Sequence, residues 1–139
     1  MMTYSLKLDN LNPVLSKFGR KIKNGVVILK GDLAAGKTTL VKKVVEALGV
    51  DDMVTSPTFS LQQCYGNKIY HYDMYNHGLE HFISLGMLEE LDKEGLHFVE
   101  WGDDKLLDIL VSAEIPTVVI EIEKISDDQR EYRIDYAHA

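Results

Sequence analysis

The chain has 139 residues, of which 45% are hydrophobic and 27% are charged. These values match one soluble globular domain with a sizeable core and leave no room for a second, so we predict a single domain over residues 1–139. Fifteen Lys and Arg against 22 Asp and Glu give a net charge of −7. An acidic surface repels nucleic-acid phosphates, so any role with RNA is expected to need a partner that supplies basic surface.

The cysteine count and the N-terminal sequence indicate the compartment. Cys64 is the only cysteine, which excludes an internal disulfide and a thiolate metal cluster and fits a reducing environment. No segment resembles a transmembrane span, and the opening MMTYSLKLDN lacks the basic start and long apolar run of a secretory signal. We therefore expect a cytoplasmic protein that makes no membrane contact.

The first thirty residues predict a strand, a helix and a second strand. Alternation predicts the first strand over Thr3–Leu8, after which Asp9 or Asn10 is placed to cap a helix. Apolar residues keep helical spacing over residues 11–22. The unbroken apolar run VVILK, Val26–Lys30, is typical of a buried parallel strand.

The middle of the chain continues with helices and a hairpin. A helix with one apolar face is predicted over Lys37–Leu48, and Ser56-Pro57-Thr58 predicts a loop. Phe59–Cys64 and Lys68–Met74 have the pattern of a β-hairpin that turns across Tyr65-Gly66-Asn67. A second amphipathic helix is predicted over residues 79–94.

The last third ends in a different pattern. Leu96–Trp101 predicts another buried strand and Lys105–Val111 a short helix. Two alternating strands then flank Ser126-Asp127-Asp128. Strands that alternate with helices, followed by a hairpin, predict a three-layer α/β domain with a mixed, mainly parallel central sheet and antiparallel hairpins.

Residues 31–38, GDLAAGKT, fit the phosphate-binding pattern G-x-x-x-x-G-K-[ST] at every fixed position. The glycines let backbone N–H groups turn inward around phosphate oxygens, and the following helix points its positive dipole end at the same anion. In this pattern Lys37 carries a mobile charge to the β- and γ-phosphates, and the Thr38 hydroxyl can ligate Mg²⁺. Because a buried strand precedes the pattern and an amphipathic helix follows it, we predict the P-loop of an NTPase rather than a chance glycine turn.

A Mg²⁺ ion in such a site needs a second anchor, usually an acid at the end of an apolar strand. Glu100 fits best because it closes the strand that begins at Leu96. Glu121 and Glu123 are rivals, but they alternate with apolar residues as solvent-facing strand residues do. The alternative for Glu100 is an exposed acid at a strand end. Trp101 beside it either stacks at the nucleotide or belongs to the core.

Asp73 is the other acid of interest. Alternation places it on one strand face with Ile69 and His71. A carboxylate that ends a strand near phosphates can orient water or accept its proton, whereas the alternative is a turn aspartate. His77 and His81 have the i,i+4 spacing of some metal sites, but without an H-E-x-x-H motif they indicate a polar helix face.

The sequence also narrows the class of P-loop protein. The only Asn-Lys pair, Asn67-Lys68, lacks the acid of a guanine-reading Asn-Lys-x-Asp motif, which disfavours a GTPase. A small-molecule kinase usually closes an arginine-bearing lid over the transferred group, whereas this chain has only Arg20, Arg130 and Arg133. A motor or transporter ATPase needs a much longer chain. The class that remains is a small ATPase whose ATP hydrolysis serves another protein.

Three further motifs follow the P-loop in order: Ser56-Pro57-Thr58-Phe59, His71-Tyr72-Asp73-Met74-Tyr75 and Val99-Glu100-Trp101. With GDLAAGKT, they resemble the bacterial TsaE family over essentially the whole chain. The resemblance implies a Mg²⁺-dependent ATPase that is required for tRNA threonylcarbamoyladenosine (t6A) modification and acts with TsaD and TsaB. In that family ATP hydrolysis drives or resets the TsaD–TsaB complex, which transfers the threonylcarbamoyl group, so tRNA is expected only as an indirect partner.

The resemblance also implies roles for individual residues. Thr58 would sense the γ-phosphate, Asp73 would position or deprotonate water, Glu100 would hold Mg²⁺ with Thr38, and Trp101 would lie beside the nucleotide. Asp73 and Glu100 can exchange roles without changing any of these patterns, and Lys37 completes the catalytic set. The residues expected to bind the ATP phosphates are Gly31, Asp32, Leu33, Ala34, Ala35, Gly36, Lys37, Thr38 and Thr39.

Two positions depart from the family pattern, and two other functions remain open. Ala34 stands where Gly is typical and Asn76 where Arg is usual, but neither removes a group essential to the cradle. The first alternative function is a free-standing P-loop kinase for a small metabolite or nucleoside, which the scarcity of arginine disfavours. The second is a nucleotide sensor, which would not need Asp73 and Glu100 for chemistry.

Overall fold

The computed structural model describes residues 2–7, 10–18, 22, 24–32, 35–50, 62–66, 68–75 and 78–138. Over these residues the chain forms a layered α/β structure in which strands and helices alternate, except that β3 and β4, α3 and α4, and β6 and β7 follow one another directly. The elements are β1 (Met2–Lys7), α1 (Asn12–Leu15), β2 (Gly25–Lys30), α2 (Lys37–Ala47), β3 (Gln62–Tyr65), β4 (Ile69–Asp73), α3 (Leu79–Ser84), α4 (Met87–Leu91), β5 (Leu96–Glu100), α5 (Asp104–Ser112), β6 (Thr117–Lys124) and β7 (Gln129–His138).

All of the described strands join one sheet, in the order β1-β7-β6-β2-β5-β4-β3. The four central strands, β6, β2, β5 and β4, run parallel to one another. The pairs β1–β7, β6–β7 and β3–β4 are antiparallel and lie toward the two edges. β2 therefore ends between two parallel neighbours, and the loop that follows it opens at the carboxyl edge of the sheet, where α/β folds bind ligands.

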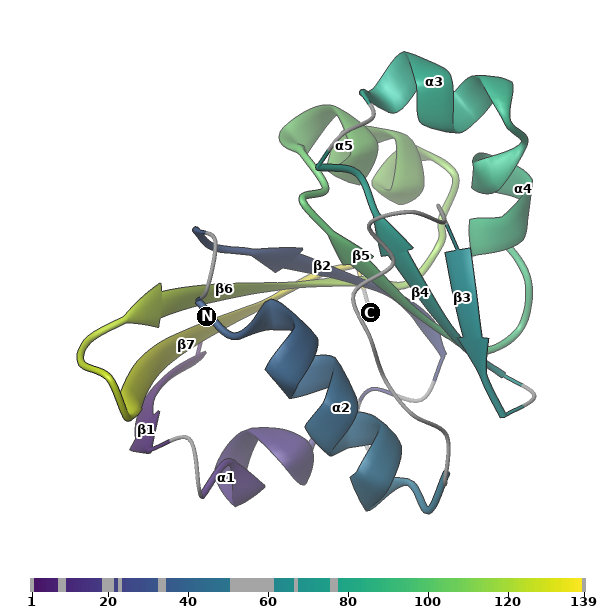
Figure 1. The fold of residues 1–139 in the computed structure, drawn as a ribbon. Helices are drawn as coiled ribbons and strands as arrows, with labels where there is room; N and C mark the ends of the chain where they lie inside the picture. Colours follow the sequence, from purple (N-terminus) through teal and green to yellow (C-terminus); the bar gives the residue numbers. More distant parts are fainter. Residues whose placement is uncertain are drawn as a thin grey trace.

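Helices cover both faces of the sheet, so that the central strands are buried on both sides (Figure 1). Val27 and Leu29 of β2 pack toward α1 and α2, whereas Val26 and Ile28 pack toward α3, α4 and α5. This explains the unbroken apolar run of β2, because every side chain of a doubly covered strand lies in a core. Each fully buried aliphatic side chain of this kind contributes about 1.5–3 kcal/mol of hydrophobic stabilisation. The predicted three-layer α/β fold is confirmed.

Two helix predictions were wrong in length. The helix predicted over residues 79–94 is two short helices, α3 and α4, separated by Gly86, which has φ 77°. A residue in this left-handed conformation ends one helix, and glycine adopts it without steric cost. In the described part of the helix predicted over residues 11–22, which leaves out 19–21, the α-helix spans Asn12–Leu15, and Leu11, not Asn10, occupies its N-cap position.

The remaining element predictions are confirmed within one or two residues where the structure describes them. Gly66 lies in the turn of the first hairpin, as predicted, whereas Tyr65, also predicted in the turn, is the last residue of β3 and pairs with Ile69. Residues 59–61, predicted as the start of that strand, lie outside the described residues, as do Ser56, Pro57 and Asp9. None of the helices that the structure describes is long and apolar enough to cross a membrane.

Candidate phosphate-binding site

The loop between β2 and α2 has the backbone that a phosphate cradle requires. Gly31 has φ 150° and Gly36 has φ 106°, both in the region that favours glycine. A Cβ atom on Gly31 would lie 2.5 Å from the carbonyl oxygen of Ile122, so no larger residue fits there. α2 begins at Lys37, directly after Gly36, and its N-terminal N–H groups face the loop.

Lys37 is held inside this loop. Its side chain is buried, and Nζ donates hydrogen bonds to the carbonyl oxygens of Gly31, at 2.5 Å, and Asp32, at 3.1 Å. Burial lowers the pKa of Lys37, while the charges of Glu100, Asp73 and Asp32 oppose that shift. The ammonium group is therefore a desolvated cation close to acids, and an anion in the loop would stabilise its charge.

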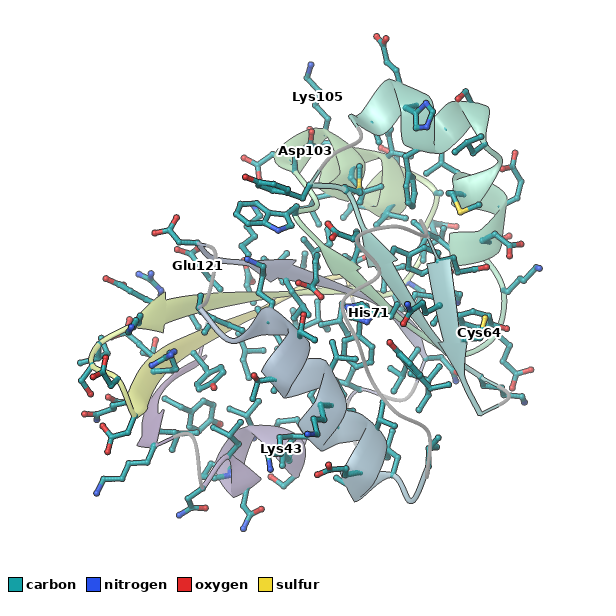
Figure 2. All side chains as sticks on the ribbon, in the orientation of Figure 1. Lys43, Cys64, His71, Asp103, Lys105 and Glu121 are labelled. Atoms are coloured by element: carbon teal, nitrogen blue, oxygen red, sulfur yellow. The ribbon has the colours of Figure 1, made fainter. Side chains whose placement is uncertain are left out.

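Glu100 is held by residues from two other elements. Its Oε2 accepts a hydrogen bond from the Thr38 hydroxyl of α2, at 2.9 Å, and lies in short contact with Nε2 of His71 on β4. Nδ1 of His71 lies 3.0 Å from the hydroxyl of Tyr65 on β3. Figure 2 shows His71 beside α2, whereas Cys64 lies on β3 at the edge of the sheet. A chain of hydrogen bonds thus runs from the sheet edge to the first turn of α2.

Asp73 lies next to Glu100 because the two residues are register partners on the parallel strands β4 and β5. Its side chain is buried, and Oδ1 accepts a hydrogen bond from the backbone N–H of Tyr75, at 2.8 Å. Both acids stand at the carboxyl ends of their strands, next to the loop that follows β2. The alternative of an exposed strand-end acid is thus wrong for Glu100, which is 4% exposed.

Trp101 forms one wall of the site. Nζ of Lys37 lies 3.8 Å from the centroid of its indole ring, and the Tyr75 ring packs against it at 4.9 Å. A cation at this distance from a tryptophan face is attracted by the ring quadrupole. Trp101 has φ 66°, an uncommon conformation for a residue other than glycine, which turns the chain sharply after β5.

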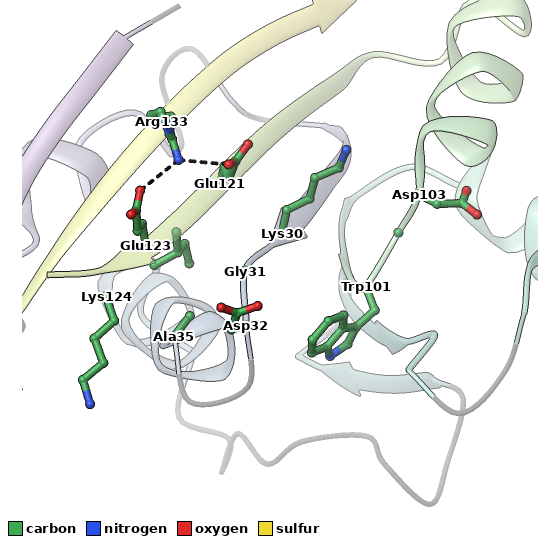
Figure 3. A pocket seen from close by; sticks show the side chains of 12 residues that line it. Lys30, Gly31, Asp32, Ala35, Trp101, Asp103, Glu121, Glu123, Lys124 and Arg133 are labelled. Carbon is green, nitrogen blue, oxygen red and sulfur yellow. Dashed lines mark hydrogen bonds and ion pairs between the residues drawn. The ribbon is translucent and has the colours of Figure 1, made fainter.

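A hollow of about 850 Å³ opens beside the loop (Figure 3). Gly31, Asp32 and Ala35 form its floor, Trp101 stands on one side, and the strands of the terminal hairpin form the other. Arg133 on the hairpin pairs with Glu121, at 2.9 Å, and with Glu123, at 3.2 Å. These two glutamates are exposed, as their alternation predicts, and both accept hydrogen bonds from Arg133.

The structure brings most of the predicted site residues together. Five of them lie together at the loop: Lys37, Thr38, Asp73, Glu100 and Trp101. Thr39, in contrast, is exposed to solvent. Leu33, Ala34, Thr58, Asn76 and His77 lie outside the described residues.

The described part of the chain holds no group of three His, Cys, Asp or Glu side chains arranged for a metal ion. His81, for which a polar helix face was predicted, is exposed on α3.

Sequence reasoning did not assign two residues that contact the site. His71 was placed on the face of Asp73, but its bond to Glu100 depends on the pairing of β4 with β5, which no local pattern reveals. Arg130 is buried, and its Nε donates to the carbonyl oxygen of Ala35 in the loop, at 2.8 Å. Arg130 is distant in sequence from the loop. The one signal for it in the sequence is that alternation places a cation on the otherwise apolar face of its strand.

The model of one protein family, described as "Threonylcarbamoyl adenosine biosynthesis protein TsaE", matches residues 8–132. The chain belongs to the TsaE family. The match includes the loop, both acids and most of the terminal hairpin, so the site described above lies within the TsaE region.

Two TsaE relatives share the sequence over most of both chains. The tRNA threonylcarbamoyladenosine biosynthesis protein TsaE of Treponema pallidum is 38% identical over 122 residues, which cover 84% of this chain and 86% of the relative. The Bacillus subtilis protein of the same name is 35% identical over 137 residues, covering 91% and 82%. The crystal structure of Bacillus subtilis YdiB matches with a TM-score of 0.65 and 28% identity over 95% of this chain and 85% of that one.

Proposed function

We propose that this protein is a Mg²⁺-dependent ATPase subunit of tRNA threonylcarbamoyladenosine synthesis, whose hydrolysis of ATP drives or resets a complex of TsaD and TsaB homologues. The observation that carries the proposal is the convergence of Lys37, Thr38, Asp73 and Glu100 on one glycine-rich loop in a member of the TsaE family. The names of the relatives supply the pathway. The geometry of the site supports the chemistry.

The loop is suited to the triphosphate of ATP. Backbone N–H groups at the start of α2 are donors for phosphate oxygens, and a phosphate would take over the hydrogen bonds that Lys37 now gives to Gly31 and Asp32. The hollow beside Trp101 leaves room for the rest of the nucleotide. Because burial lowers the pKa of Lys37, a bound polyphosphate would also restore the stability of its charge.

Thr38 and Glu100 are the residues that would hold Mg²⁺. A hydroxyl and a carboxylate oxygen that already lie 2.9 Å apart form the kind of hard oxygen donor pair that this ion prefers, with phosphate oxygens and waters as further ligands. When bound, Mg²⁺ would offset negative charge on the transferred phosphoryl group. His71 keeps the Glu100 carboxylate turned toward Thr38, so this half of the site is prepared in advance.

Asp73 is the residue best placed to act on water. It is buried beside Glu100, and because Oδ1 is occupied by the Tyr75 N–H, its position in the site is fixed. A carboxylate held at the phosphate end of the site can orient the attacking water and take up its proton. Glu100, engaged by Thr38 and His71, is less free for that role.

The charge of the protein favours a role within a complex. A net charge of −7 disfavours direct contact with tRNA, whereas an acidic surface can dock on a basic partner face. Within the described residues the two arginines are also engaged, Arg130 with backbone carbonyls and Arg133 with glutamates. A partner that completes the site would explain the lack of an internal arginine lid.

The test is ATP turnover by the purified chain, alone and with TsaD, TsaB and tRNA, with Lys37→Met as the inactive control. We expect slow turnover alone, a several-fold increase with the complex, and no turnover by the control. If turnover ignores these partners while labelled phosphate from ATP appears on a small molecule of a cell extract, the protein is a kinase and the proposal is wrong.

A further inference from the structure

Arg130 is a buried cation that the proposed mechanism does not use. It lies near the start of β7 and is only 6% exposed. Its Nε donates to the Ala35 carbonyl, and its Nη1 donates to the carbonyl oxygens of Ser126, at 2.6 Å, and Gln129, at 3.1 Å. The guanidinium therefore ties the phosphate-binding loop to the turn of the terminal hairpin, two segments about ninety residues apart in sequence.

The partners of Arg130 are backbone carbonyls. Among the described residues no carboxylate lies within ion-pair distance of it, whereas Arg133, three residues on, pairs with three glutamates. A buried charge balanced only by carbonyl dipoles is costly to maintain, because burial removes its hydration. Such a cation beneath a phosphate cradle would be stabilised when an anion binds, and would raise the affinity for that anion.

The bond to Ala35 has a geometric consequence for the next residue. The Ala35–Gly36 peptide is trans and planar, so its C=O and N–H groups point in opposite directions. Arg130 holds the carbonyl toward the hairpin, which leaves the Gly36 N–H directed away from the hairpin. Gly36 has φ 106° and precedes Lys37, so this N–H belongs to the set at the beginning of α2 that surrounds the loop.

We propose that Arg130 is a positioning residue: by fixing the Ala35–Gly36 peptide, it aims the Gly36 N–H at the terminal phosphates of the bound nucleotide. This inference rests on the proposed function, because it assumes that the loop binds a nucleotide. In this proposal the terminal hairpin contributes to the phosphate site through the side chain of Arg130. Arg130 itself does not need to contact the phosphates.

The test compares wild-type protein with Arg130→Met and Arg130→Lys. ADP affinity is measured by calorimetry, and the Gly36 amide is followed by ¹H–¹⁵N NMR during ADP addition. In the wild type we expect a downfield shift of the Gly36 amide proton, as for an N–H that donates to phosphate. In R130M we expect that shift to be lost and ADP to bind about tenfold more weakly or worse, as for one charge-assisted hydrogen bond.

R130K is expected to lose part of the Gly36 shift and part of the ADP affinity, because an ammonium group can replace one hydrogen bond of the guanidinium group but not all of them. Lys68→Met is the matched control, since it removes an exposed cation that pairs with Glu94 away from the loop, and its ADP affinity should stay within twofold of wild type. A purely structural role of Arg130 would lower the thermal stability of R130M but leave the Gly36 shift in the folded fraction intact.

The outcomes separate this inference from the proposed function. A folded R130M with the wild-type Gly36 shift and affinity would overturn the inference alone. If R130M does not fold, the same result in R130K would overturn it. A wild-type protein that binds no ADP would overturn the proposed function and this inference with it.

Discussion

Glu100 is the residue on which the elements of the site converge. It ends β5, receives the hydroxyl of Thr38 from α2 and contacts His71 from β4. A carboxylate buried to this degree needs such partners, because an ionised group without them would be strongly destabilised. The same contacts fix its orientation before any ligand binds, as the proposed role of Glu100 in holding Mg²⁺ requires.

If Asp73 has the proposed role, replacing it by Asn should separate ATP binding from ATP hydrolysis. The amide keeps an oxygen that can accept from the Tyr75 N–H, so the fold of the site should be retained. It cannot take a proton from water, and we expect ATP turnover to fall about 10²–10⁴-fold while ATP affinity changes little. Single-turnover hydrolysis and calorimetry on D73N measure the two quantities. The control Asp108→Asn changes an exposed residue of α5 and should leave both unchanged.

A nucleotide sensor would respond differently to the same substitution. Its output depends on binding alone, so D73N would keep its effect on a TsaD–TsaB complex. Retention of wild-type turnover in D73N would instead assign the proton transfer to another residue.

The sequence predicted those residues of the site that belong to a recognisable motif or stand at the end of a predicted strand. Lys37 and Thr38 follow from the P-loop motif, and Glu100 and Asp73 from their places at strand ends, which a parallel pairing aligns. Arg130 and His71 were not assigned because their partners lie in other elements, at sequence separations of 95 and 29 residues. Such contacts depend on strand order, which the amphipathic pattern of each strand does not contain.

At the scale of elements, Gly31 connects β2 to the loop that is proposed to bind phosphate. A Cβ atom at this position would meet the Ile122 carbonyl oxygen at 2.5 Å and the Ala35 Cβ at 3.1 Å, and φ is 150°. We expect Gly31→Ala to lower the free energy of unfolding by about 1–3 kcal/mol and to weaken nucleotide binding. Urea denaturation and ADP titration of the variant measure the two effects.

Gly78→Ala is the matched control for this prediction. A Cβ on Gly78 would meet no atom within 4 Å, and φ is −68°, which any residue adopts. Its cost should stay below about 1 kcal/mol, that of a weaker N-cap for α3. Equal losses in G31A and G78A would contradict a specific requirement for glycine at position 31.

The strands were more predictable than the helices. β2 and β5 are mainly apolar because helices cover both faces of the sheet, and the sequence pattern reports that burial directly. The helical spacing of residues 79–94 is equally real, yet Gly86 in a left-handed conformation divides it into α3 and α4. Periodicity reports which residues face the core, and two short helices on one surface satisfy it as well as one long helix.

At the scale of the whole molecule, the sheet separates the candidate site on one face from a buried polar network around His97 on the other. His97 of β5 is fully buried, its Nε2 lies 2.8 Å from the Lys93 carbonyl oxygen, and its Nδ1 lies 2.7 Å from the Tyr72 hydroxyl. The neutral ring satisfies both partners, donating to the carbonyl and accepting from the hydroxyl. Burial raises the pKa of Tyr72, which keeps that hydroxyl protonated.

His97 should therefore make stability depend on pH. Burial lowers its pKa below the usual 6.5, despite the bond to the Lys93 carbonyl and the charge of Glu90, which raise it. As pH falls below 6.5, the unfolded chain takes up a proton that the folded protein does not, so stability falls until the lowered pKa is reached. The slope from this group is at most about 1.4 kcal/mol per pH unit.

Urea midpoints at pH 7.5 and 5.5 should show this loss of stability in the wild type and a smaller loss in His97→Gln. The control His81→Gln, on the exposed face of α3, should keep the wild-type difference. If H97Q retains the full difference, the acid sensitivity of the fold arises elsewhere.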